Sequence, residues 1–286
     1  MTAPHTLLKT HRLMAKKQLG QNFLAEPGLA RQMAQLARLS PSDAVLEIGA
    51  GLGMLTVAIA GVARRVWAIE TDGRLIELLK SELALAGMAN VTVVKADFLG
   101  MRLAPFEDET GRPLVVMGNL PYHLSSQILV SLIEQRASVE RAILMFQKEM
   151  AERLVAPPGG KTYGRLTAML GYCARVKALK DYPARHFFPR PRIDSSVVEI
   201  RFRNAPVAAA IDETFLFQTI KAAFAQRRKT LKNALAGSFL KPTPAAVQSA
   251  LAAAGIDPRR RAETLEAVEF VHLSNALFNA LKPPSP

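Results

Sequence analysis

Residues 44–53 read AVLEIGAGLG, a short apolar run that passes directly into a glycine-rich turn. The run predicts a buried strand, and the glycines predict a tight turn into a helix. Four further apolar runs follow, at residues 65–70, 91–94, 114–117 and 142–146. Because helical patterns separate these runs, we expect βαβ units and a parallel sheet covered by helices on both faces.

The pattern changes in the second half of the chain. Strand patterns return at residues 174–179 and 197–202, after a loop-like stretch at 157–164. From about Ile211 the pattern is helical, with one break near residues 241–244. We therefore place a domain boundary between Phe202 and Ile211.

One chemically distinctive residue follows each of the first four strands. These residues are Gly49, Glu70, Asp97 and Asn119. In open α/β sheets, ligands bind in the crevice at the carboxyl ends of the strands. The four residues therefore predict a ligand site on one edge of the sheet.

The glycine turn and Glu70 indicate a nucleotide cofactor. A carboxylate about twenty residues after such a turn accepts hydrogen bonds from ribose hydroxyls and disfavours a 2′-phosphate, which argues against NADP. The dinucleotide pattern would have a third glycine where this chain has Met54, so S-adenosylmethionine is favoured over NAD. Asp97 either accepts a bond from an adenine amino group, beside the apolar Phe98, or only caps a turn.

The sequence NLPY at residues 119–122 predicts chemistry on an amine. An adenine amine is a poor nucleophile, because its lone pair is delocalised into the ring. The Asn119 side-chain oxygen and a nearby backbone carbonyl could accept both amine hydrogens and favour a pyramidal nitrogen. Tyr122 offers a ring on which a flipped base can stack. The alternative is a plain Asn-x-Pro turn.

Four motifs together resemble one family. They are GQNFL at 20–24, EIGAG at 47–51, NLPY at 119–122 and FFPRPRIDS at 187–195. The chain is thereby identified as similar to the bacterial small-subunit (16S) ribosomal RNA adenine N6,N6-dimethyltransferases, the KsgA family, from about Lys16 to the C-terminal helices. It departs from the family pattern at Ala50, where proline is usual, and at His123, where asparagine is common.

The resemblance implies an α/β fold: a Rossmann-like, S-adenosylmethionine-dependent methyltransferase sheet with a small C-terminal helical domain. The expected parts are a basic N-terminal arm with a cofactor-covering motif (1–25), a catalytic domain (26–205) and an RNA-binding helical domain (206–286). The implied activity is dimethylation of two adjacent adenosines near the 3′ end of 16S rRNA, in the small subunit or its precursor, with a role in subunit biogenesis.

The resemblance also implies roles for particular residues. The cofactor contacts would be Asn22, Leu24, Gly49, Gly51, Glu70, Asp97 and Asn119. The target base would be held by Asn119, the Leu120 carbonyl and Tyr122. Phe187 would form the opposing aromatic wall, with Phe188 as an adjacent rival.

The charge balance favours a polyanionic partner. Lys and Arg total 37 against 24 Asp and Glu, a formal net charge of +13. Arg227, Arg228 and Lys232 are the candidate phosphate contacts, with residues 259–261 as a second cluster. No acidic residue precedes Glu26, and we expect the leader to be a mobile basic arm.

Composition narrows the remaining possibilities. A single cysteine, Cys173, excludes an intramolecular disulfide and a multi-cysteine zinc site. We expect a cytoplasmic monomer that binds no membrane and no metal. Two alternatives stay open: a 23S rRNA adenine N6-methyltransferase of the macrolide-resistance type, and a ribosome-assembly factor that acts mainly by binding.

Overall fold

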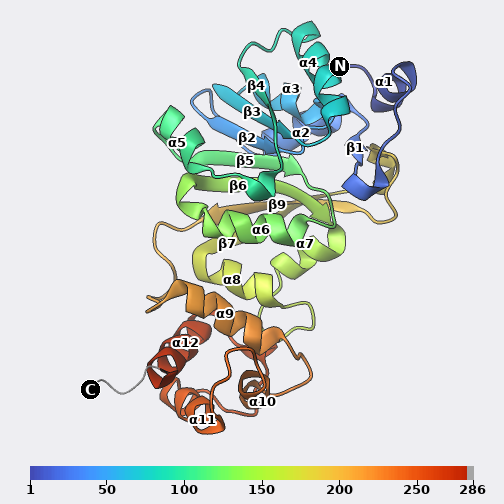
Figure 1. Ribbon diagram of the computed structural model, residues 1–286. Coiled ribbons are helices and arrows are strands. Elements are labelled where there is room, and N and C mark those ends of the chain that lie inside the picture. Colours follow the sequence, from blue (N-terminus) through green and yellow to red (C-terminus); the bar gives the residue numbers. More distant parts are fainter. Residues whose placement is uncertain (282–286) are drawn as a thin grey trace. The chain divides into compact units, whose positions relative to one another are not determined.

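The computed structural model describes residues 1–281 and contains one large sheet, in the order β4-β3-β2-β5-β6-β9-β7 (Figure 1). The strands are β2 (Ala44–Ile48), β3 (Arg65–Glu70), β4 (Val91–Lys95), β5 (Leu114–Asn119), β6 (Val139–Gln147), β7 (Ala174–Tyr182) and β9 (Ser195–Phe202). Every strand expected from the sequence is present. β4, β3, β2, β5 and β6 run parallel, as predicted. β9 pairs antiparallel with β6, so the sheet is mixed.

Helices cover both faces of this sheet. α2 (Pro27–Leu36) and α3 (Met54–Ala60) share a core cluster with inward-facing residues of β2, β5 and β6, and α4 (Gly73–Leu85) packs Leu79 and Leu83 with Ala68 of β3. Trp67, the neighbour of Ala68, faces the other way and meets Phe106 of α5 (Ala104–Thr110), with ring centroids 5.3 Å apart. α6 (Ser125–Glu134) buries Leu129 completely.

The leader folds, contrary to the expectation of a mobile arm. Residues Pro4–Thr10 form α1, and its Leu7 and Leu8 are buried with Phe23 and Leu52. The burial of this leucine pair gives the segment a fixed place. β1 (Phe23–Leu24) then pairs antiparallel with β8 (Phe187–Phe188) in a separate two-stranded sheet.

The chain divides into two compact units that are not consecutive in sequence. The first comprises residues 1–151 and 177–202, and the second comprises 152–176 and everything after 202. The boundary expected between a catalytic domain and an RNA-binding domain, at residues 205/206, stays a prediction. The compact units differ from these predicted domains because α8 (Arg165–Cys173) packs against α9 (Glu213–Phe224) and α12 (Ala267–Leu281), which places α8 in the second unit.

The second unit is mainly helical, as predicted, but the helical pattern expected from Ile211 to about residue 241 is interrupted. α9 ends at Phe224 and α10 begins at Leu231. The intervening residues 225–230 read AQRRKT and offer no large apolar side chain to the core, so a turn separates the helices. α11 (Pro244–Ala253) begins after the predicted break. Within residues 1–281, no helix combines the length and apolarity needed to cross a membrane.

Candidate active site

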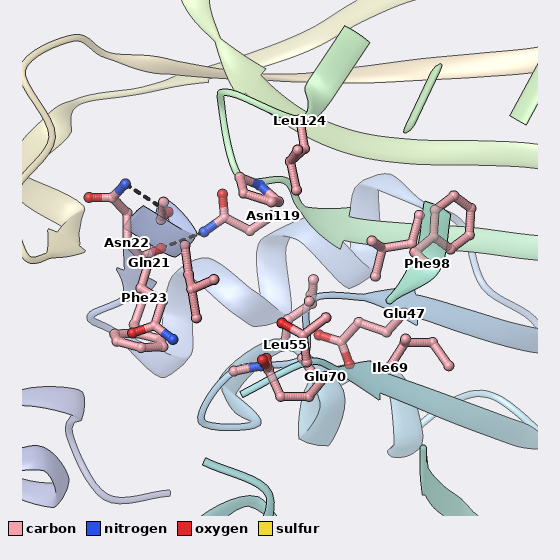
Figure 2. Close-up of a pocket in the computed structure, with 18 of the residues that line it drawn as sticks. Gln21, Asn22, Phe23, Glu47, Leu55, Ile69, Glu70, Phe98, Asn119 and Leu124 are labelled. Atoms are coloured by element: carbon pink, nitrogen blue, oxygen red, sulfur yellow. Dashed lines mark hydrogen bonds between the residues drawn. The ribbon is translucent and has the colours of Figure 1, made fainter. Parts of the chain in front are cut away.

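The strand order reverses between β2 and β5, which places the ligand crevice of the sheet at this point. A pocket opens there, with about 990 Å³ of empty space including solvent at its mouth. Its walls come from four regions of the first unit: the β2–α3 turn, the ends of β3 and β4, the end of β5, and residues 19–24 (Figure 2). All seven expected cofactor contacts line this pocket.

The β2–α3 turn requires glycine at several positions. Gly49, Gly51 and Gly53 have φ angles of +72°, +57° and +85°, which side chains rarely adopt. A Cβ on Gly51 would lie 3.1 Å from the Phe23 ring. The turn therefore exposes backbone to the pocket at the start of α3.

Glu70 holds this turn in place. Its Oε2 accepts a hydrogen bond from the Gly51 amide and its Oε1 accepts one from the Asp72 amide, each at 2.8 Å. The side chain is buried, and this desolvation raises its pKa despite the amide bonds. Each carboxylate oxygen keeps a second lone pair, so the group can still accept bonds from the pocket.

Asp97 caps a turn, and its contact with a cofactor stays a prediction. Its Oδ1 accepts a bond from the Leu99 amide at 3.0 Å, the capping arrangement. It is also exposed and lines the pocket beside the buried Phe98. A carboxylate that lines a pocket can bind an amine or hydroxyl there.

Asn119 lies across the crevice from the glycine turn. Its Nδ2 donates to the Asn22 carbonyl at 2.7 Å, which leaves Oδ1 as the acceptor end (Figure 2). Close strand packing fixes the residue, since a Cβ on the preceding Gly118 would lie 2.6 Å from the Ile48 carbonyl oxygen. The Leu120 side chain is buried. Within residues 1–281, no hydrogen bond is recorded to the Leu120 carbonyl or to Asn119 Oδ1.

The aromatic residues expected at the base site differ in accessibility. Tyr122 is half-buried, its hydroxyl lies 2.9 Å from Ser195 Oγ, and burial raises its pKa. Phe187 is buried in the main core cluster. Phe188 is partly exposed, with its ring edge-on to His5. The structure thus gives Phe188 the more accessible ring.

Residues 19–24 close one side of the pocket. Gly20 lies so near the NLPY turn that an added Cβ would be 3.0 Å from Pro121 Cβ. Asn22 Nδ2 donates to the Gly20 carbonyl at 3.2 Å, and Leu24 is buried beside it. Gln21, which the sequence did not single out, donates to Asp72 at 3.0 Å and anchors the segment to α4.

Glu47 is a second residue that the sequence interpretation passed over. It lines the pocket, is almost fully buried, and its Oε2 has no partner within residues 1–281. Burial raises its pKa to about 8, so the carboxyl is mostly protonated at neutral pH. The sequence did carry a signal for this residue, because Glu47 is the one charged residue in the otherwise apolar strand β2.

The three expected phosphate contacts lie in the second unit. Arg228 is exposed between α9 and α10, and Lys232 is exposed on α10. Arg227 is also exposed, but it donates to the Lys161 carbonyl and lies 3.6 Å from Glu263. In the second cluster, Arg259 pairs with Asp257 and Arg260 with Glu269.

Comparison with known proteins identifies the family. A family model described as "Ribosomal RNA adenine dimethylase" matches residues 12–278. The chain belongs to this family. It is 47% identical over 279 residues to "Ribosomal RNA small subunit methyltransferase A" of Desulforapulum autotrophicum, covering 98% of both chains. It is 41% identical to the protein of that name from Anaeromyxobacter dehalogenans, covering 96% of this chain and 98% of that one.

Two solved structures extend the similarity. A dimethyladenosine transferase from Plasmodium falciparum superposes with a TM-score of 0.74 at 27% identity, over 88% of this chain and 95% of that one. The 23S rRNA methyltransferase ErmE gives a TM-score of 0.67 at 27% identity, over 90% of this chain and all of that one. The family thus confirms the predicted Rossmann-like methyltransferase fold and the predicted enzyme class.

Proposed function

We propose that this enzyme uses S-adenosylmethionine to methylate twice the N6 amine of adenosines in small-subunit ribosomal RNA. The main support is that two features line the same pocket. One is the glycine turn held by Glu70, and the other is Asn119, whose side-chain oxygen is free to accept a hydrogen bond. Relatives named as small-subunit methyltransferases at up to 47% identity support this choice of RNA over the large-subunit alternative.

The residues of the pocket fit the cofactor. S-adenosylmethionine, when bound, supplies an electrophilic methyl group on a sulfonium sulfur. Glu70 accepts bonds from the ribose hydroxyls, and Asp97 accepts one from the adenine amino group. Phe98 provides an apolar surface for the adenine ring. Gly49 and Gly51 let the backbone approach closely, and Asn22 and Leu24 close the pocket from the N-terminal side.

The NLPY turn holds the target amine. Asn119 Oδ1 and the Leu120 carbonyl accept its two hydrogens, which favours a pyramidal nitrogen with its lone pair aimed away from both acceptors. The bond from Asn119 Nδ2 to the Asn22 carbonyl fixes which end of the amide faces the amine. No strong base is needed, because the nitrogen loses its proton readily once it is alkylated.

Aromatic side chains hold the flipped base. Tyr122 stacks on one face, since stacking on aromatic rings is the usual way to bind an unpaired base. Phe187 forms the opposing wall, with Phe188 as the rival. Phe187→Leu and Phe188→Leu variants decide between them, because only loss of the stacking ring weakens RNA binding without unfolding the chain.

Mass spectrometry of rRNA digests tests the proposal. Small subunits lacking the modification are incubated with the enzyme and methyl-labelled S-adenosylmethionine, and large subunits serve as the parallel substrate. We expect two N6,N6-dimethyladenosines in 16S rRNA and none in 23S rRNA. Label in 23S rRNA alone would assign the large-subunit activity instead. Subunit binding without label would favour an assembly factor.

A further inference from the structure

We propose that the leader (residues 1–25) and the segment around β8 (residues 183–193) together form a second RNA-binding surface, which holds phosphates flanking the target adenosine. This inference rests on the proposed function and extends it. It concerns the first unit only, and it is separate from the cations of the C-terminal helices.

Two acid-free segments supply the surface. Residues 1–25 contain Lys9, Arg12, Lys16 and Lys17 and no Asp or Glu, and residues 183–193 contain Arg185, Arg190 and Arg192 and no Asp or Glu. The chain as a whole has about two acids for every three bases. Two long segments without a single acid therefore depart from the average composition in the same direction.

The fold brings these distant segments together. β1 and β8 pair with Phe23 opposite Phe188 and Leu24 opposite Phe187. The Ala25 amide extends the pairing by donating to the His186 carbonyl at 2.9 Å. α1 joins the same assembly, because His5 lies edge-on against Phe188 at 5.4 Å. Since β1 also lines the cofactor pocket, the joint surface borders the active site.

The cations of this surface are available to a ligand. Lys9, Arg12, Arg185, Arg190 and Arg192 are exposed, and no ion pair is recorded for any of them within residues 1–281. The neighbouring acids already have partners, some of them on these two segments. Asp72 is bound by Arg74 and Lys16, Glu26 lies 3.2 Å from His186, and Asp194 accepts the Ala184 amide.

RNA suits this surface better than an anionic membrane does. A membrane-binding surface needs apolar side chains that can insert, and the leucines of α1 are buried in the core. The exposed large apolar residues are Met1 and Met14 on the leader and Ile193 on the segment around β8. Single apolar side chains among cations resemble the wedges by which proteins contact unstacked bases.

The test is the salt dependence of binding to a hairpin RNA that carries the target adenosines. Each phosphate contact contributes about 0.7–0.9 to the log–log slope. We expect a leader variant (Lys9→Gln with Arg12→Gln) and a loop variant (Arg190→Gln with Arg192→Gln) each to lower the slope by about 1.5, and the combined variant by about 3. Cofactor affinity and turnover at saturating RNA should stay at the parent level.

A control variant removes the same charge elsewhere on the first unit. Arg64→Gln with Lys80→Gln alters two exposed cations outside these segments, and we expect it to keep the parent slope.

Equal slopes for all four variants and the parent overturn the proposal, as does an effect confined to one segment. Loss of binding to phosphatidylserine vesicles with an unchanged RNA slope would assign the surface to membranes. If the RNA slope falls but no 16S rRNA is methylated, the surface stands and the proposed function fails.

Discussion

The phenolic oxygen of Tyr122 lies 2.9 Å from Oγ of Ser195, the first residue of β9. Ser195 is fully buried, and Tyr122 belongs to the turn that follows β5. The bond therefore ties the proposed stacking ring to a rigid strand, and it predicts that Ser195 positions Tyr122.

We expect Tyr122→Phe and Ser195→Ala each to lower turnover about 2- to 12-fold, because a hydrogen bond of this kind contributes about 0.5–1.5 kcal/mol. The double variant should lose little more than the worse single variant, since both remove the same bond. Turnover and RNA affinity are measured for all four proteins. If the losses in turnover of the two single variants add up fully in the double variant, Ser195 does not act through Tyr122. Ser195→Thr, which retains a hydroxyl, should recover part of the rate if it folds normally.

Glu70→Ala should weaken S-adenosylmethionine binding about 10- to 150-fold, since the ribose hydroxyls lose charge-assisted bonds worth about 1.5–3 kcal/mol. Calorimetry measures the affinity. Glu70→Gln is the matched variant: it keeps one acceptor oxygen but places an amide N–H opposite a backbone N–H of Gly51 or Asp72. We expect it to lose affinity as well. Parent affinity in both variants would remove Glu70 from the site.

Glu47 predicts a pH dependence of stability. Burial raises its pKa to about 8 from a usual value of 4.5. Between these values the folded protein keeps a proton that the unfolded chain has lost, so stability falls as pH rises. Each pKa unit corresponds to about 1.36 kcal/mol, and the loss should amount to a few kcal/mol. Glu47→Gln stays neutral, and its unfolding free energy should fall less from pH 5 to pH 8.5. Parallel curves for parent and variant would contradict this assignment.

The C-terminal cations should contribute unequally to RNA binding. Arg227, Arg228 and Lys232 are all exposed. Arg227, however, is engaged by the Lys161 carbonyl and Glu263. We expect Arg228→Ala with Lys232→Ala to lower the salt slope by about 1.5–2. Arg227→Ala should change it less, and it serves as the internal comparison. A larger effect of Arg227 would show that its ion pair opens when RNA binds.

The sequence predicted the elements whose signals are local. Every strand of the large sheet was expected, because each apolar run stands between turn or helix patterns. The four residues at the strand ends do meet at one pocket, since parallel strands bring their carboxyl ends to one edge.

Long-range contacts produced the features that the sequence missed. Phe23 pairs with Phe188, a residue 165 positions away in the sequence. No local sequence pattern predicts a strand of only two residues. α1 depends on Leu7 and Leu8 finding a core cluster. The engagement of Arg227 depends on Glu263, which only the folded chain brings near.

Asn119→Ala tests the proposed chemistry most directly. Asn119 Oδ1 should bind the amine more strongly as the nitrogen pyramidalises, so its loss falls mainly on the transition state. Removing one preorganised polar contact at a reacting centre costs about 10²–10³ in rate. The variant also loses the bond to the Asn22 carbonyl, which loosens the pocket cover. Turnover is therefore measured at saturating S-adenosylmethionine.

RNA affinity should survive in Asn119→Ala, since the proposed phosphate contacts all lie on other residues. Asn119→Asp is the matched variant. It keeps an acceptor oxygen but cannot donate to Asn22, so it separates the role of Oδ1 from that of Nδ2. A parent rate in Asn119→Ala at saturating cofactor would refute the proposed role of the side chain. Normal subunit assembly by a variant that does not methylate would show that binding is the act that assembly requires.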